Sequence, residues 1–147
     1  MTLPRPQRIG HDSPPGSLLK RVGVALPAAP RKDAGDRDAS YLALVRQCPC
    51  LHCGMEPSEA AHVRMASAAH GKASGMQKQP ADKWALPLCA EHHRNAKNAQ
   101  HKQSEAAFWN DLGINAPQTC ERLYAQRDDL VAMQAVVLIT IAERSKR

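Results

Sequence analysis

Three cysteines and a histidine occur in two short pairs that are typical of a metal site. Cys50 and Cys53 form a Cys-x-x-Cys pair, and Cys89 and His92 form a Cys-x-x-His pair. A Cys-x-x-Cys turn holds two thiolates close together, and two such pairs supply the four ligands of a tetrahedral Zn²⁺ ion. We therefore predict a structural zinc site at Cys50, Cys53, Cys89 and His92. Because His93 directly follows His92, spacing alone does not decide which of these two histidines binds the zinc.

Three further histidines, His62, His93 and His101, are not needed for a four-coordinate zinc site. A neutral imidazole near pH 7 is a natural base for activating water, which is the role we predict for His62. The other two imidazoles can hold a second divalent cation against a phosphate. The combination predicts phosphodiester hydrolysis with a second metal at His93 and His101.

The elements that position these residues are expected to be short, and the fold class that follows is a small α+β domain stabilised by the zinc knuckles. His62 is expected on the first strand of a hairpin, and His93 near the start of a polar helix. In chain order, we expect a helix over 41–46, a strand over 58–65, a loop over 66–82, a strand over 83–88, and helices over 91–100, from 104 to Gly113, over 118–126 and over 128–144.

The chain divides into three expected parts. Residues 1–38 are rich in proline and basic side chains and are expected to form a mobile arm. Residues 39–127 are expected to form the zinc domain. Residues 128–147 are expected to form a helix that either packs on this domain or self-associates. No stretch reaches the ~20 apolar residues of a membrane span.

The formal net charge of +6 favours polyanionic partners, with nucleic acid first. The five cysteines and the lack of a secretory signal predict reduced thiols and a cytoplasmic location. The alternative explanation of this charge is a merely soluble basic protein. The candidate nucleic-acid contacts are five basic side chains: Arg64, Lys72, Lys78, Arg94 and Lys97.

The order of these motifs resembles the HNH endonucleases, also called His-Me finger or ββα-metal nucleases. The resemblance rests on Cys50-x-x-Cys53, Ala61-His62, Leu88-Cys89-x-x-His92-His93 and His101, and covers about residues 41–124. It is closest to the phage and prophage branch that includes RecA-dependent recombination nucleases.

This resemblance implies a ββα-metal core and a DNA endonuclease of phage or prophage recombination or DNA processing. It implies that His62 is the general base and that His93, with His101, binds catalytic Mg²⁺ or Mn²⁺. DNA is the implied partner, with a recombinase or other DNA-processing protein as a further candidate.

The sequence departs from the family pattern at two positions. Ala61 occupies the place of an aspartate or histidine that normally binds the metal, and Trp84 occupies that of an asparagine. A backbone carbonyl or Asp82 is then left to orient His62. The alternative function is a catalytically silent zinc module that binds nucleic acid or a protein.

Overall fold

The computed structural model describes residues 36–73 and 79–144, all of which belong to one unit, residues 32–147. Almost all of the predicted N-terminal arm therefore lies outside the described residues, as does Lys78. The described chain combines a two-stranded sheet with several short helices, as the α+β prediction requires.

The sheet is an antiparallel pair of four-residue strands, β1 (Glu59–His62) and β2 (Ala85–Leu88). His62 lies opposite Ala85, and Glu59 lies opposite Leu88. All four residues of β2 are buried, whereas β1 is mostly half-buried. The hairpin prediction is confirmed, although both strands are shorter than the sequence pattern indicated.

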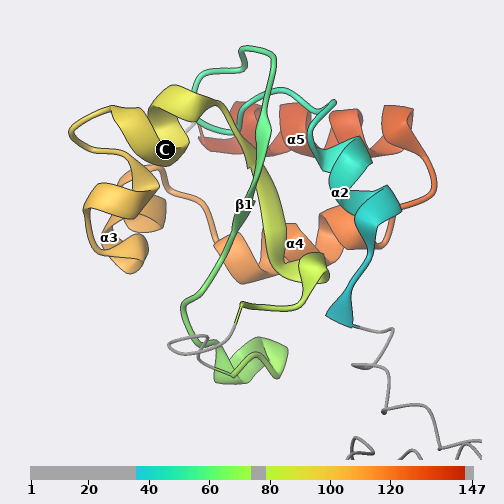
Figure 1. Cartoon of the computed structure of the whole chain (residues 1–147), viewed down its shortest axis with the longest axis horizontal. Coiled ribbons are helices and arrows are strands. Elements are labelled where there is room, and N and C mark those ends of the chain that lie inside the picture. Colours follow the sequence, from blue (N-terminus) through green and yellow to red (C-terminus); the bar gives the residue numbers. More distant parts are fainter. Residues whose placement is uncertain (1–35, 74–78, 145–147) are drawn as a thin grey trace, which may run out of the picture. The chain divides into compact units, whose positions relative to one another are not determined.

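Four α-helices surround this sheet: α2 (Ala39–Val45), α3 (Glu105–Asp111), α4 (Ala116–Tyr124) and α5 (Leu130–Arg144). In Figure 1 the sheet lies between α2 on one side and α3 on the other, and α5 runs beside α4. The described residues also contain four short helical turns: η2 (Ala68–His70), η3 (Asp82–Trp84), η4 (Glu91–Asn95) and η5 (Gln100–Lys102).

Local capping explains where the α-helices begin and end. The Asp38 carboxylate accepts a hydrogen bond from the Tyr41 N–H at 2.9 Å, and Asn115 does the same for α4. Asp129 accepts from the Ala132 N–H at the start of α5. Gly113 follows α3 with a φ of +67°, a left-handed conformation that glycine adopts without strain.

The predicted helix over 91–100 is wrong. A single π-helical turn, η4, ends at Asn95, and Ala96 is extended with a ψ of 156°. The segment is polar and has no apolar face to bury, so packing does not hold it in one helix. The chain re-enters a helical turn at η5, and this break returns His101 to His93.

Two smaller differences concern the segment between the two strands. The predicted strand over 83–88 begins instead with the turn η3, and Trp84 is buried there. The predicted loop over 66–82 contains η2 and a bridge between Ser67 and Lys72. Both turns use backbone hydrogen bonds that hydrophobic periodicity does not report.

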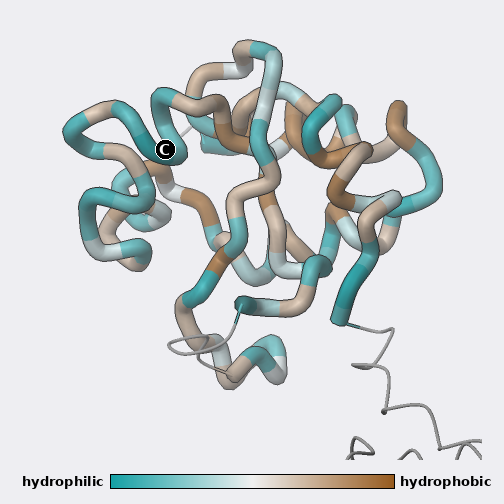
Figure 2. Tube along the Cα trace, viewed as in Figure 1, coloured by the Kyte–Doolittle hydropathy of each residue, from teal (hydrophilic) through white to brown (hydrophobic). Residues whose placement is uncertain are grey.

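The core is built around β2, and hydrophobic residues of several helices pack against it. Figure 2 shows the hydropathy of each residue along the chain. Phe108 and Trp109 of α3, Leu123 of α4, and Met133 and Val137 of α5 are all buried in it. The C-terminal helix thus shares the core of the zinc domain. Within the two described segments, no helix has the length and apolarity that a membrane span requires.

Candidate functional site

The four predicted zinc ligands come together at one end of the hairpin. Their ligand atoms all lie within 4.8 Å of one another. Cys89 Sγ lies 3.1 Å from His92 Nδ1, and Cys53 Sγ lies 3.8 Å from Cys89 Sγ. Tetrahedral zinc with Zn–S bonds of about 2.3 Å separates its sulfurs by about 3.8 Å. Cys50, Cys53, Cys89 and His92 therefore form a possible metal site that is compatible with structural zinc.

A backbone hydrogen bond holds the first ligand pair against the sheet. The Leu51 N–H donates to the Pro87 carbonyl at 3.0 Å, which fixes the first pair beside β2. Gly54 closes that turn with a φ of +72°. Burial raises the pKa of the Cys50 thiol, so its thiolate depends on a bound cation.

The last residue of α5 holds the first ligand pair from the other side. The Arg144 guanidinium donates to the carbonyls of Leu51 and His52, both at 2.8 Å. The His52 ring stacks on the His92 ring with centroids 3.7 Å apart. The half-buried His52 ring therefore covers one of the metal-site residues. Burial, together with the charges of His92 and Arg144, lowers the His52 pKa.

The His62 side chain is held by a buried carboxylate. Its Nε2 lies 3.1 Å from Asp82 Oδ1, and the Asp82 side chain is 5% exposed. The same carboxylate accepts from Arg37 Nη1 at 3.2 Å and from the Asp38 N–H at 2.8 Å. Burial by itself raises the Asp82 pKa, but these hydrogen bonds lower it below its ordinary value. Of the two orienting groups that the sequence left open, Asp82 occupies the position.

His93 and His101 form an adjacent pair. Their ring centroids are 4.4 Å apart and nearly perpendicular. His93 Nδ1 lies 2.6 Å from Glu59 Oε2, and Glu59 also pairs with Arg94. Partial burial alone raises the Glu59 pKa, but hydrogen bonds from His93 and Arg94 lower it overall. Since Glu59 engages Nδ1 of His93, the Nε2 atom remains for a ligand.

The backbone after His62 is clamped by two further side chains. The Glu105 carboxylate accepts from the N–H groups of Arg64 and Met65 at 2.8 and 2.6 Å. Gln100 Nε2 donates to the His62 carbonyl and to Glu105. These two acceptors determine the orientation of the amide, and its oxygen Oε1 is buried with no hydrogen-bond partner in the described chain.

His62 and His101 line the same cavity, which we call the His62 cavity. It has a volume of about 310 Å³, and its wall also includes Arg64, Gln100, Gln103 and Glu105. Burial, followed by the charges of His93, Arg64 and Arg94, lowers the His101 pKa. His101 is therefore neutral near pH 7 and able to bind a cation.

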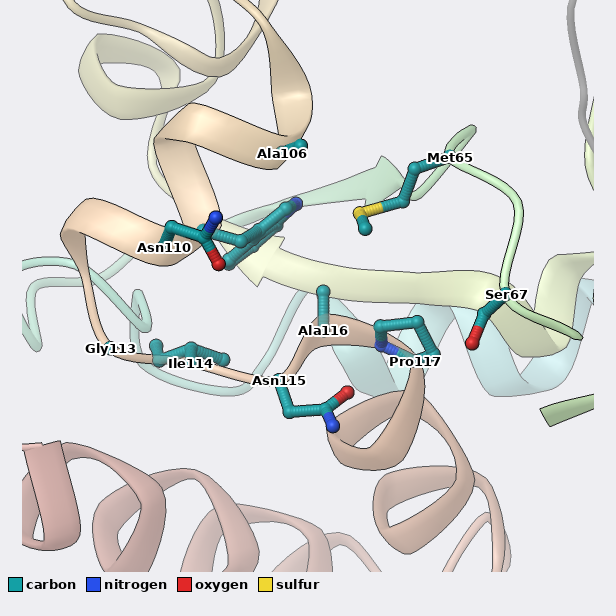
Figure 3. A pocket seen from close by; sticks show the side chains of 10 residues that line it. Met65, Ser67, Ala106, Asn110, Gly113, Ile114, Asn115, Ala116 and Pro117 are labelled. Atoms are coloured by element: carbon teal, nitrogen blue, oxygen red, sulfur yellow. The ribbon is translucent and has the colours of Figure 1, made fainter. Parts of the chain in front are cut away.

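A larger cavity, of about 420 Å³, is lined by residues that include Met65 and Ala106. Figure 3 shows Met65 and Ser67 on one side of it and Asn110 and Asn115 on the other. Its wall contains no charged residue. The smaller, charged His62 cavity is therefore the better candidate site for phosphate chemistry.

The five predicted nucleic-acid contacts have different environments. Arg64 and Lys97 are exposed, and Arg94 is exposed but paired with Glu59. Lys72 is 5% exposed, and its Nζ donates to the Met65 carbonyl at 2.8 Å. The prediction that Lys72 contacts nucleic acid is wrong, because the side chain lies against Trp84 in the interior. Lys78 lies outside the described residues.

Several site residues were not found from the sequence. Glu59 lies two positions before Ala61, so the alternation of the strand places both residues on one face. An acidic residue at this position was the available signal of a further site residue. Ala61 itself is fully buried, so no side chain there reaches the His62 cavity. Arg144, Gln100 and Glu105 had no local signal. Cys48 is buried and lies outside the metal site.

Comparison with known families gives one match. A family model described as "Protein of unknown function (DUF968)" matches residues 24–116, which is more than half of the chain. The chain belongs to this family. The matched part of this DUF968 chain contains all four ligands of the metal site and the three further histidines, whereas α5 lies beyond it. No curated protein and no solved structure matches the chain.

Proposed function

We propose that this DUF968 protein is a metal-dependent endonuclease that hydrolyses phosphodiester bonds in DNA, with a ββα-metal core formed by β1, β2 and η4. The observation that carries the proposal is the His62–Asp82 pair at the edge of a cavity that also contains His101 and Arg64. A base held by a buried carboxylate, beside a second imidazole and an arginine, suits the hydrolysis of an anionic ester.

In this reaction His62 takes the proton from the attacking water. Asp82 engages Nε2, so Nδ1 is the atom that accepts this proton. The water oxygen forms the new bond to phosphorus, and the bond from phosphorus to the leaving sugar oxygen breaks. Arg64 provides positive charge for the phosphate at the cavity wall. Asp82 is a positioning residue, because it acts through His62.

His93 and His101 would hold the catalytic cation, which, when bound, stabilises the charge that develops on the phosphate and the leaving oxygen. A histidine ligand commonly donates its other ring nitrogen to a carboxylate, and Glu59 provides this for His93. Imidazole donors favour first-row transition ions, so we expect Mn²⁺ to support activity better than Mg²⁺.

The second candidate is a zinc module that binds nucleic acid or a protein without cleaving it. One observation favours it: across residues 36–73 and 79–144, Cys50, Cys53, Cys89 and His92 form the one group of three or more potential ligands gathered closely enough for a metal. His93 and His101 alone are a sparse site for a second ion.

Plasmid nicking by the purified full chain with Mn²⁺ separates the two functions. His62→Ala should reduce nicking by about 10²–10⁴-fold, which is the usual contribution of a general base. Zinc content and DNA affinity should not change. His70→Ala is the matched control, because His70 also pairs with a carboxylate, Glu121 at 2.8 Å, but does not line the His62 cavity.

The control variant should cleave like the unaltered protein. Cleavage by His62→Ala at the unaltered rate would reject the nuclease and leave the zinc module as the function. Equal loss of activity in His62→Ala and His70→Ala would show that the effect is structural and would also reject the assignment of His62 as the base.

A further inference from the structure

The α5 helix is apolar on two opposite sides. Met133, Val137 and Thr140 are buried against the rest of the domain. On the other side lie Val131, which is 75% exposed, and Leu138, which is 57% exposed. Together with the exposed Ala135 and Ala142 they follow a spacing of i, i+4, i+7 and i+11, which places them on one face of a helix. We call these four residues the outer stripe.

The outer stripe is unusual for a water-facing surface. Of the four large hydrophobic residues that are exposed in the described chain, three belong to α5: Val131, Leu138 and Ile139. No charged residue occurs from Leu130 to Ala142. A helix that is apolar all round is normally buried on all sides. The outer stripe therefore has the character of a contact surface.

We propose that the outer stripe binds the outer stripe of a second copy of this chain, with the two α5 helices antiparallel. A two-fold axis between positions 135 and 138 places Val131 opposite Ala142 of the other copy and Leu138 opposite Ala135. Every large side chain then meets a small one, so two identical surfaces interlock. A parallel pair would set Leu138 against Leu138 and alanine against alanine.

The charges at the two ends of α5 support the same arrangement. Asp128 and Asp129 outnumber Arg127 before the helix, whereas Arg144, Lys146 and Arg147 outnumber Glu143 at its other end. In an antiparallel pair each acidic end lies near the basic end of the other copy, and the helix dipoles oppose each other. A parallel pair would bring like charges together. Charge and side-chain size therefore select the same partner, a second copy in the antiparallel direction.

Sedimentation of the full, zinc-loaded chain tests the proposal. We expect a species of about twice the 16.0 kDa chain mass at ~100 µM protein. Leu138→Glu should raise the dissociation constant by about 100-fold or more, because the two-fold interface contains the change twice. Met55→Glu is the matched control: Met55 is also a large hydrophobic residue, 65% exposed, but lies outside α5, so the dimer should persist.

A double variant tests the direction of the helices. Ala135→Lys and Leu138→Glu together should restore the dimer to within about ten-fold of its original affinity, because each lysine then faces a glutamate of the other copy. Circular dichroism and zinc content establish that each variant is folded. A full chain that is monomeric at every concentration would overturn the proposal. A stripe that is covered by residues 1–35 or by another protein would give this result. A dimer that Leu138→Glu leaves intact, or the absence of rescue by the double variant, would also overturn it.

Discussion

At the scale of single residues, Asp82 links two separate segments of the chain at the candidate site. It joins His62 to Arg37 and to the backbone of Asp38, although these residues are far apart in the sequence. The Asp82 pKa is lowered in the folded state, so the ionised carboxylate stabilises the folded protein relative to the unfolded chain. The same carboxylate thus contributes to stability and positions the proposed base.

Asp82→Asn should lower the free energy of unfolding by about 1–3 kcal/mol at pH 7, since it weakens buried hydrogen bonds to a charge. The contribution of a carboxyl with a lowered pKa is present above its unfolded value of about 3.9 and is lost as the pH falls through the folded value. The difference between the two proteins should therefore shrink progressively below about pH 4. Urea unfolding between pH 3 and 7 measures it.

Glu121→Gln provides the control for this measurement, because Glu121 also pairs with a histidine but its side chain is 50% exposed. An exposed pair contributes only about 0.2–1 kcal/mol. A difference for Asp82→Asn that stays constant down to pH 3 would show that its ionisation is not coupled to folding.

At the scale of elements, α5 connects the C-terminal part of the chain to the metal site. Its final residue, Arg144, donates two hydrogen bonds to the backbone of the first ligand pair. The helix itself is anchored by Met133 and Val137 in the common core. The packing of α5 therefore stabilises the turn that presents Cys50 and Cys53.

Arg144→Ala should lower the free energy of unfolding by about 1–3 kcal/mol, because two buried carbonyls lose a charged donor. The turn between the cysteines should also open more often, so zinc should pass to a chelating dye several-fold faster. Arg122→Ala is the control, since Arg122 makes an exposed ion pair with Glu143 at 3.4 Å and should change stability by no more than about 1 kcal/mol. Unchanged zinc release in Arg144→Ala would contradict this role.

At the scale of the whole molecule, the domain has few bulky residues with which to build a core. Aromatic residues make up 3% of the chain, and the sheet has only two strands. A structural zinc ion contributes about 10–16 kcal/mol of apparent folding free energy in small peptides, compared with a typical net stability of about 5–15 kcal/mol. The metal is therefore expected to be essential to the fold.

Cys50→Ser should unfold the domain, with loss of the zinc and of the circular dichroism signal of the folded chain. Cys48→Ala is the matched control: Cys48 is equally buried, two positions earlier, but its Sγ contacts the Leu44 carbonyl and not the metal site. This variant should retain one zinc ion and a cooperative unfolding transition. A folded, zinc-free Cys50→Ser protein would show that the core suffices without the metal.

The local features of this protein follow from residues a few positions apart. The two ligand pairs and the end of α3 at Gly113 each depend on contacts within one turn, so their spacing predicted them correctly. Hydrophobic alternation likewise predicted the hairpin that carries His62.

The partners of the histidines and of the metal site were decided only by the tertiary structure. Asp82 lies 20 residues from His62, Glu59 lies 34 residues from His93, and Arg144 lies 93 residues from Leu51. For His62 the sequence left Asp82 and a backbone carbonyl open, and it predicted neither Glu59 nor Arg144 as a partner. These pairs meet because the hairpin and the core helices bring distant segments together, and because the polar segment after His93 has no apolar face that would keep it helical past Asn95. The sequence therefore indicated the four residues of the possible metal site, whereas packing determined which groups lie beside them and beside the further histidines.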